Sequence, residues 1–358
     1  MRIAIVHDWL SNLGGAERVL IELHKTFPKA PIYVLFCNNK FIHEFLPEAE
    51  IKTSSLQKIP FITKIYKYLF FMMPSAIESF DLSDFDIVVS SSVIFSKGLV
   101  LKPKTRHICY CYSPTRVLWD RNSENENKSA LAILSRHLLR IWDRQASDRV
   151  DEFVAISKHV QARIKKYYGK ESKIIYPSTF TTTRDVVMTK SMDNLEYYLI
   201  VSRLFPHKNI DVAIDAFNKL GYELIIIGDG PAKKNLRKMA GKNIKILGHK
   251  TNEEVIDYYR NCKAFIMPQE EDFGLTPIEA MSFGKPVLAL RIGGALETVV
   301  EGVTGEFFDD PIPEALADGV RRLNENYSNY NSLAIQKWTE KFSQNRFRKE
   351  MLKLIDPT

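Results

Sequence analysis

The sequence predicts an α/β protein of two domains, each a parallel β-sheet covered by helices on both faces. Short apolar runs alternate along the chain with segments of helical periodicity, which is typical of repeated strand–helix units. The 358 residues are more than one hydrophobic core usually organises. A polar, threonine-rich stretch at 178–194 has no apolar period and separates two such alternations, so we predict that it is the linker.

The first alternation defines a domain at residues 1–180. Its apolar runs are short and are followed by turn residues or by helical spacing, so we expect them to be the strands of one parallel sheet. The predicted strands are 3–6, 31–36, 86–89, 106–112, 152–157 and 173–177, and the predicted helices are 16–27, 130–149 and 158–168.

The second alternation defines a domain at residues 195–337. Its strands are short, mainly apolar runs, as expected for strands that are largely buried. They are predicted at 197–201, 223–227, 244–247, 264–267 and 287–290. A basic helix predicted at about 332–355 outlasts this sheet, and we expect the C-terminal part of the chain, about 338–358, to pack back on the first domain.

Composition and charge narrow the function classes. Hydrophobic residues at 45% and charged residues at 26% are ordinary for a soluble protein, and the net charge of +7 favours an anionic partner. Four cysteines are too few for a disulfide framework. No signal peptide is visible, and no apolar run is long enough to form a membrane-spanning helix. The expected location is the cytoplasm, and the absence of a recognition motif predicts no nucleic acid partner.

Residues 58–73 interleave lysines with aromatic and aliphatic side chains. One interpretation is a helix packed on the core with its lysines reaching outward. The other is a surface that contacts an anionic membrane, which would place the protein on the inner face of the membrane. The pattern fits both equally. A polar loop at 121–128 is predicted to be mobile.

The most informative stretch of the second domain runs from the strand at 264–267 to the strand at 287–290. Thr276, Pro277 and Glu279 have the spacing of a helix that starts with a capping box, and a free helix start after a glycine-containing loop can bind an anion. Glu271 and Glu279 flank that start. Carboxylates there suit a ligand that also carries hydroxyl groups. The alternative is that Glu279 only closes the capping box and that Glu271 is solvated.

Two cations follow the first strand of the second domain, Arg203 and Lys208. The planar fork of arginine and the point charge of lysine together suit a diphosphate, and the carboxyl edge of such a sheet is the usual place for a ligand. Glycines at 228, 230, 274, 293 and 294 stand at equivalent strand ends, which favours the diphosphate over two unrelated surface cations.

These residues resemble a known family. Arg203…Lys208, Gly228-Asp229-Gly230-Pro231, Glu271-x7-Glu279 and Gly284-x-Pro286…Gly293-Gly294…Glu297 are similar to glycosyltransferase family 4, a retaining group with the GT-B fold. The segments Gly14-Gly15-Ala16-Glu17-Arg18 and Trp142-Asp143-Arg144…Asp148-Arg149-Val150-Asp151 resemble its mannosyltransferases of surface-polysaccharide assembly. The resemblance covers nearly the whole chain, and it implies two facing Rossmann-like domains with an interdomain cleft.

The resemblance also implies roles for residues. Arg203 and Lys208 would clamp the donor diphosphate, Glu279 would bind the ribose, and Glu271 would bind the transferred sugar. The amides of Phe273, Gly274 and Leu275 would complete the donor pocket, with Gly248 and Lys250 near the base. Gly14 and Gly15 would let the donor phosphate approach the first domain.

One position departs from the family pattern. Relatives often carry a histidine after the strand at 106–112, where this chain has Tyr112, so the catalytic set implied here is Arg203, Lys208, Glu271 and Tyr112. His107 lies earlier in that strand and is as compatible with a packed core residue. Asp84 and Asp86 precede a buried strand and are interpreted as structural, so no essential metal and no cofactor are expected.

The function implied is transfer of a hexose with retention, with mannose from GDP-mannose as the first choice of donor. The acceptor would be a saccharide or lipid-linked saccharide in surface-polysaccharide biosynthesis. A UDP-sugar-dependent transferase and a catalytically silent nucleotide-sugar-binding protein are the alternatives. A dehydrogenase is disfavoured, because the G-x-G-x-x-G fingerprint is absent.

Overall fold

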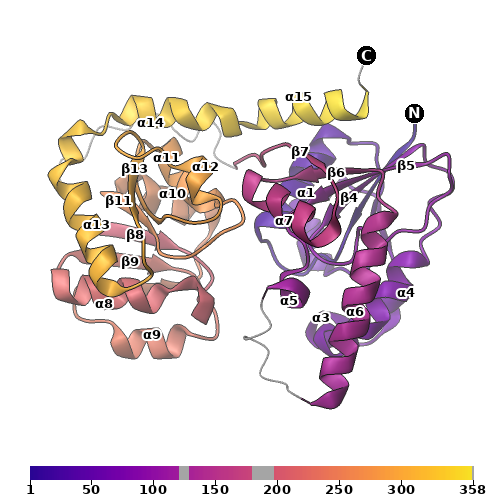
Figure 1. The fold of residues 1–358 in the computed structure, drawn as a ribbon, viewed down its shortest axis with the longest axis horizontal. Helices are drawn as coiled ribbons and strands as arrows, with labels where there is room; N and C mark the ends of the chain where they lie inside the picture. The colour runs from indigo at the N-terminus through magenta and orange to yellow at the C-terminus, as the bar shows by residue number, and fades with distance from the viewer. Residues whose placement is uncertain (121–128, 180–196, 357–358) are drawn as a thin grey trace. The chain divides into compact units, whose positions relative to one another are not determined.

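A computed structural model describes residues 1–120, 129–179 and 197–356 (Figure 1). Two compact units divide the chain. Unit 1 comprises Met1–Ser178 together with Gln344–Thr358, and unit 2 comprises Thr179–Ser343. The loop predicted to be mobile at 121–128 and most of the predicted linker lie outside the described residues.

Unit 1 is built on a seven-stranded parallel sheet with the order β3-β2-β1-β4-β5-β6-β7. The strands are β1 Ile3–His7, β2 Ile32–Val34, β3 Ile51–Thr53, β4 Ile87–Ser92, β5 Arg106–Cys111, β6 Glu152–Ala155 and β7 Ser172–Ile174. The main helices are α1 Gly15–Thr26, α2 Asn39–Phe45, α6 Ala130–Asp148 and α7 Lys158–Tyr168, and a short helix, α5, spans Arg116–Trp119. Sequence reasoning missed β3, a half-exposed edge strand with almost no apolar residues.

Unit 2 is built on a six-stranded parallel sheet with the order β10-β9-β8-β11-β12-β13. The strands are β8 Tyr197–Val201, β9 Glu223–Ile227, β10 Ile244–Gly248, β11 Ala264–Met267, β12 Val287–Leu290 and β13 Gly305–Phe308. The helices are α8 Ile210–Leu220, α9 Lys233–Met239, α10 Asn252–Asn261, α11 Leu275–Ser282, α12 Ala295–Thr298 and α13 Pro313–Glu325. Each sheet has the order of a Rossmann-like domain, in which the strand order reverses beside the first strand.

The predicted strands of unit 2 agree closely with the observed ones, because β8, β9, β11 and β12 are nearly continuous apolar runs whose side chains are buried. The strand β13 was not predicted. It begins at Gly305, where an added Cβ would lie 1.9 Å from the carbonyl oxygen of Val287. Only glycine allows the two strands to pair so closely there, and a glycine at a strand start carries no apolar signal.

Residues 58–73 do not form the single helix that one of the two interpretations assumed. The segment contains the 3₁₀ helix η1 Ser55–Lys58, the single-turn helix α3 Ile62–Ile65 and the 3₁₀ helix η2 Tyr66–Met72, and it continues into α4 Met73–Glu78. Pro60 precedes the first break, and Phe61 has a φ of 56°, which an apolar residue adopts only under constraint. A second irregularity falls at Leu69, where the φ and ψ angles leave the helical region.

The prediction of one helix at 332–355 is also wrong. The segment divides into α14 Ser332–Thr339, the 3₁₀ helix η5 Glu340–Phe342 and α15 Gln344–Ile355, with an extended residue at Ser343. Phe342 is buried in unit 2, where its ring meets that of Phe273 at 5.4 Å. Phe347 is buried in unit 1 against Tyr110, at 5.8 Å between ring centroids. The break occurs where the chain leaves one core for the other.

Within unit 1, α15 packs on α1. The Nε of Arg348 lies 2.6 Å from Oε1 of Glu22 on α1, and an Nη of Arg106 donates to the carbonyl oxygen of Leu354 at 3.2 Å. Phe347 and Met351 are fully buried. The last helix therefore completes the core of unit 1, although unit 2 separates it from that unit in the sequence.

Candidate functional site

The carboxyl ends of the unit 2 strands gather the residues predicted to bind a donor. All six strands are parallel, so the loops that follow them emerge at one edge of the sheet. The order of the strands reverses between β8 and β11, and an open α/β sheet binds its ligand at such a reversal. Arg203 and Lys208 follow β8, whereas Glu271 follows β11, so the reversal lies between them.

Lys208 and Glu271 are in direct contact. The Nζ of Lys208 lies 2.6 Å from Oε1 of Glu271, and the Nε2 of Gln269 donates to the same oxygen at 2.9 Å. The Lys208 residue is only 6% exposed, whereas about a third of the Glu271 side chain faces solvent. The sequence prediction placed a cation and a carboxylate on one ligand, and the structure brings these two side chains together.

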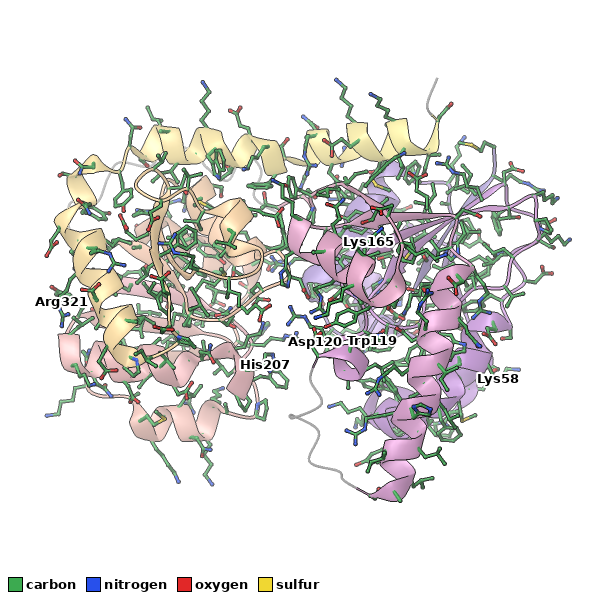
Figure 2. All side chains as sticks on the ribbon, in the orientation of Figure 1. Lys58, Trp119, Asp120, Lys165, His207 and Arg321 are labelled. Atoms are coloured by element: carbon green, nitrogen blue, oxygen red, sulfur yellow. The ribbon has the colours of Figure 1, made fainter. Side chains whose placement is uncertain are left out.

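The loop after β8 is fixed to the loop after β11 by Asn209. Its Nδ2 donates to the carbonyl oxygen of Pro268 at 3.1 Å, and its backbone adopts a φ of 50°. Asparagine tolerates this left-handed conformation better than most residues. The turn Pro206–Lys208, which contains the His207 labelled in Figure 2, is thereby attached to the segment that leads from β11 to Glu271.

The glycine pair 293–294 lets the loop after β12 approach the segment that carries Glu271. The amide of Gly294 donates to the carbonyl oxygen of Glu271 at 2.8 Å. An added Cβ at Gly293 would lie 2.4 Å from that same oxygen, and one at Gly294 would lie 2.4 Å from the backbone of Phe273. These glycines are therefore required by the packing of the two loops, whatever they contribute to a ligand.

The start of α11 differs from the prediction. The helix begins at Leu275 rather than after Thr276, its N-cap is Gly274 with a φ of 92°, and no side chain caps it. The predicted capping box of Thr276 and Glu279 is thus wrong, because a glycine in the left-handed region starts the helix earlier than the threonine. Glu279 is instead buried, and its Oε2 accepts a hydrogen bond from the hydroxyl of Tyr259 at 2.9 Å.

The other predicted donor-binding residues of unit 2 lie at the same edge. Arg203 is exposed, and its guanidinium lies 5.6 Å from the ring of Phe205. Gly248 ends β10 with a φ of 86°. Lys250 follows it, and its Nζ lies 2.7 Å from Oε1 of Glu254, so this ammonium already has a carboxylate partner. Phe273 is buried between Glu271 and Gly274, and its ring does not face solvent.

The corresponding edge of unit 1 carries Gly14 and Gly15 at the start of α1. The amide of Gly14 donates to Oε2 of Glu17 at 2.9 Å. The other oxygen of Glu17 lies 3.8 Å from Nε2 of His7, the last residue of β1. The Nδ1 of His7 lies 2.9 Å from the carbonyl oxygen of Ser91. The carboxylate of Glu17 therefore already accepts a hydrogen bond from the amide of Gly14, which a donor phosphate was predicted to approach.

Tyr112 braces this edge of unit 1. Its hydroxyl donates to the carbonyl oxygen of Ala16 at 3.0 Å and lies 2.8 Å from the hydroxyl of Ser91. Burial holds the pKa of the phenol well above its usual value of 10.0, so the hydroxyl keeps its proton. The side chain joins the first turn of α1 to the end of β4, and a catalytic part for Tyr112 stays a prediction.

Sequence reasoning also missed Asp8, the residue directly after β1. It is 1% exposed, and its two carboxylate oxygens accept the four successive backbone amides of residues 93–96 at 2.5 to 3.0 Å. These four hydrogen bonds fix the loop after β4 beside the carboxyl end of β1.

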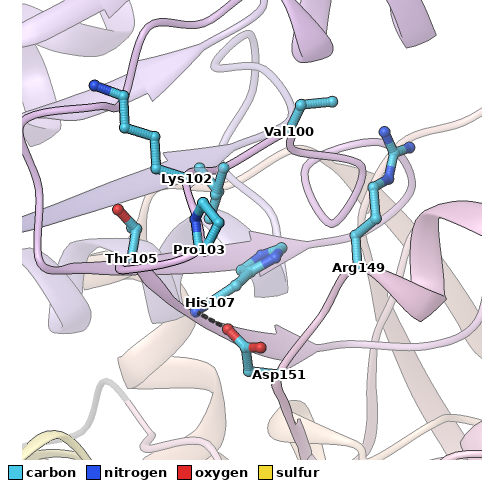
Figure 3. Close-up of a pocket in the computed structure, with 8 residues that line it drawn as sticks. Val100, Lys102, Pro103, Thr105, His107, Arg149 and Asp151 are labelled. Carbon is cyan, nitrogen blue, oxygen red and sulfur yellow. Dashed lines mark hydrogen bonds between the residues drawn. The ribbon is translucent and has the colours of Figure 1, made fainter.

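A cavity of about 260 Å³ lies at the opposite edge of the unit 1 sheet (Figure 3). It is lined by residues of the loop before β5 and by His107, Arg149 and Asp151. His107 is buried, its Nε2 lies 2.8 Å from Oγ of Ser90, and its backbone amide donates to Asp151. Burial lowers its pKa to about 4, so the ring is neutral at physiological pH. His107 is thus a core residue and lies away from the carboxyl edge.

Asp84 and Asp86 also lie at the amino end of their strand, β4. Asp86 accepts the backbone amide of Arg2 at 2.7 Å, which agrees with the structural interpretation. Among the residues that the structure describes, no group of three or more histidine, cysteine, aspartate or glutamate side chains could hold a metal ion. Within the same residues, no helix combines the length and the hydropathy needed to cross a bilayer.

Comparison with known proteins identifies the class of both units. The family model described as glycosyltransferase family 4 matches residues 13–178, and the model described as glycosyl transferases group 1 matches residues 185–338. The HepE protein of Anabaena, solved in complex with UDP, matches the fold with a TM-score of 0.73 at 18% identity, over 100% of both chains. The chain belongs to the family 4 glycosyltransferases and has the GT-B fold, with two Rossmann-like domains.

The curated relatives are distant. An uncharacterized glycosyltransferase of Methanocaldococcus jannaschii is 27% identical over 52% of this chain, and the match spans 53% of that protein. The alpha-1,3/1,6-mannosyltransferase ALG2 of Candida glabrata is 24% identical over 84% of this chain and 78% of its own length. A GDP-mannose-dependent alpha-(1-6)-phosphatidylinositol monomannoside mannosyltransferase of Mycobacterium tuberculosis is 26% identical over 50% of this chain and 54% of its own length. This protein is therefore a glycosyltransferase with mannosyltransferases among its relatives.

Proposed function

We propose that this protein is a retaining hexosyltransferase that moves mannose from GDP-mannose to a saccharide or lipid-linked saccharide in surface-polysaccharide biosynthesis. The observation that carries the proposal is the contact of Lys208 with Glu271 at 2.6 Å, at the reversal of strand order in unit 2. A buried cation beside a partly exposed carboxylate suits a ligand whose diphosphate and sugar hydroxyls lie side by side.

The names of the relatives support mannose and the guanosine nucleotide. One is an alpha-1,3/1,6-mannosyltransferase, and another uses GDP-mannose on a phosphatidylinositol glycolipid. The complex of HepE with UDP supports the alternative of a UDP-sugar on the same scaffold. An acceptor attached to a lipid lies in a bilayer, so the proposal puts the protein on the cytoplasmic face of a membrane.

The proposed reaction needs no nucleophile from the protein. The acceptor hydroxyl forms its bond to the anomeric carbon on the face from which the nucleoside diphosphate departs, and its proton passes to the departing phosphate oxygen. The configuration is retained because bond formation and bond breaking share one face. The contribution of the protein is electrostatic, since Lys208 and Arg203 offset the charge that develops on the diphosphate.

The two carboxylates would hold the ends of the donor. Glu271 faces solvent in part, so its carboxylate can accept hydrogen bonds from hydroxyls of the transferred sugar. Glu279 is buried and accepts a hydrogen bond from Tyr259. The ribose must therefore reach past the first turn of α11 to contact the carboxylate of Glu279. We expect no essential metal, because lysine and arginine supply the positive charge in this scheme.

The donor is tested by thermal unfolding with GDP-, UDP- and ADP-sugars at equal concentration. A ligand that binds only the folded protein at a hundred times its dissociation constant stabilises it by about 2.7 kcal/mol. We expect GDP-mannose to raise the melting temperature most. A larger rise with a UDP-sugar would replace the donor and keep the class of reaction.

The site is tested with Lys208→Ala and Glu271→Ala, each of which should abolish sugar transfer while the protein stays folded. The matched control is Lys219→Ala, which breaks an exposed pair with Glu314 on the surface of the same unit at 2.5 Å. Wild-type transfer by either site variant would contradict the assigned chemistry. A protein that binds the donor but transfers nothing to any acceptor would be the silent binding protein instead, and the anomeric configuration of the product, read by NMR, tests retention.

A further inference from the structure

The helix α6 of unit 1 carries an exposed apolar stripe. Leu131, Leu134, Leu138 and Ile141 are between 44% and 75% exposed. Their spacing of three and four residues places them on one side of the helix. Single exposed leucines are normal, but a contiguous apolar patch on a soluble domain marks an interaction surface.

A second group of exposed apolar side chains lies on the segment that contains α3 and η2. Phe61, Tyr68 and Phe71 are between 67% and 82% exposed. Their neighbours Leu69 and Phe70 turn inward and pack on the core of unit 1. The irregular helical turns of this segment therefore point some aromatic rings into the core and the others outward.

The two groups belong to one region of unit 1. The ring of Phe95 meets Phe70 at 4.7 Å and Trp142 of α6 at 5.6 Å, so both segments pack on the same buried side chain. The Nε1 of Trp142 also donates to Oε1 of Glu78, which ends α4, at 2.8 Å. Figure 1 shows α3, α4 and α6 together. We name as the apolar face the exposed residues Phe61, Tyr68, Phe71, Leu131, Leu134, Leu138 and Ile141.

The segments that carry the apolar face contain cations but no acidic residue. Residues 55–77 include Lys58, Lys64 and Lys67, and residues 129–142 include Arg136 and Arg140, without a single aspartate or glutamate in either stretch. Figure 2 labels Lys58 in this region. The acidic residue that follows the first stretch, Glu78, is paired with Arg149 at 2.9 Å.

We propose that the apolar face docks on the surface of an anionic lipid bilayer. Exposed aromatic and aliphatic side chains enter the boundary between headgroups and acyl chains, and the surrounding lysines bind the negative headgroups. A second copy of the chain is a poorer occupant. A symmetric dimer would place this face against itself, so the cations of residues 55–77 and 129–142, two stretches without an acidic residue, would meet their own copies.

The inference extends the proposed function, because a lipid-linked acceptor lies in such a surface, and it can fail separately. Docking requires no donor and no transfer. A protein that docks but transfers nothing would refute the proposed function alone, and one that transfers sugar to a soluble acceptor without docking would refute this inference alone.

The test is sedimentation of the full chain with vesicles of phosphatidylcholine, with or without phosphatidylglycerol. Wild type should bind the anionic vesicles preferentially. Leu134→Asp with Leu138→Asp should lower that binding at least tenfold. The matched control is Leu333→Asp with Leu352→Asp, which adds the same charges at exposed leucines of α14 and α15, and it should bind as wild type does. Circular dichroism would show that both double variants are folded.

A second variant separates charge from apolar contact. Replacing Lys58, Lys64 and Lys67 with alanine should weaken binding to anionic vesicles by about a hundredfold, at about fivefold for each lysine. Unchanged vesicle binding by both the leucine and the lysine variants would overturn the proposal. So would lipid-free self-association, measured by light scattering, that the leucine variant abolishes, because the face would then bind a second copy.

Discussion

Replacing Gly294 with alanine tests whether the position of Glu271 controls the proposed chemistry. Gly294 has a φ of −65° and a ψ of −18°, a conformation that alanine adopts without strain. The only obstacle is steric, since the new Cβ would lie 2.4 Å from the backbone of Phe273. An ordinary contact begins at 3.4 Å, so the segment that carries Glu271 and Phe273 must move by roughly 1 Å.

The expected effect follows from that displacement. Backbone on both sides of the contact leaves no flexible side chain to give way, so overpacking should lower the free energy of unfolding by about 1 to 3 kcal/mol. A misplacement of about 1 Å at a reacting group costs about a hundredfold in rate. The turnover number for sugar transfer should therefore fall about a hundredfold, while chemical denaturation shows a folded protein with a lowered midpoint.

The control is Gly302→Ala. Gly302 has a φ of 72°, and nothing lies within 4 Å of the Cβ that alanine would add. This variant carries the backbone strain that Gly294→Ala lacks and none of its steric overlap, so it should lose about 1 kcal/mol of stability at unchanged turnover. Wild-type turnover and stability in Gly294→Ala would refute the reasoning, since the loop would then tolerate the methyl group without moving Glu271.

Three further predictions concern buried polar groups. The ring of His107 has a pKa of about 4 in the folded protein and about 6.5 in the unfolded chain, so the unfolded chain takes up a proton first as the pH falls. The free energy of unfolding should therefore fall by about 3 kcal/mol between pH 7 and pH 4. In denaturant titrations, His107→Gln should remove that part of the pH dependence. The buried ammonium of Lys97 lies 2.6 Å from the carboxylate of Asp143, and Asp143→Asn removes that negative charge. We expect the free energy of unfolding, measured in urea, to fall by about 3 to 5 kcal/mol. An unchanged midpoint would contradict this prediction. Tyr259→Phe removes the hydroxyl that donates to Glu279 and should weaken donor binding, measured by calorimetry, more than it lowers the melting temperature.

The fold was predictable because its strands are buried on both faces. The runs 224–227 and 264–267 contain no polar residue, and the strands predicted at 223–227 and 264–267 match β9 and β11 residue for residue. The elements that were missed or misjudged lack that signal. The strand β3 is half exposed. The break near Ser343 arises because Phe342 is buried in the core of unit 2 and Phe347 in the core of unit 1, and no local sequence pattern predicts such a division.

The candidate site was predictable in its residues and less so in its contacts. Lys208 and Glu271 follow strands that the sequence identified, and parallel strands bring their ends to one edge. Two hydrogen bonds of the site form between side chains that meet only after folding. They join Gln269 to Glu271 and Tyr259 to Glu279. The start of α11 was misjudged because Thr276 and Glu279 have the right spacing, whereas the decisive property is the positive φ of Gly274.

The helix α15 has a consequence for how the protein is made. Phe347 and Met351 fill the core of unit 1, yet they are synthesised only after all of unit 2. During synthesis on a ribosome, the apolar surface of unit 1 that α15 covers therefore stays exposed until unit 2 has been synthesised. A fragment that stops at residue 178 should be aggregation-prone until a peptide spanning 344–356 is added, and its rescue would show that this segment is what covers the exposed core of unit 1.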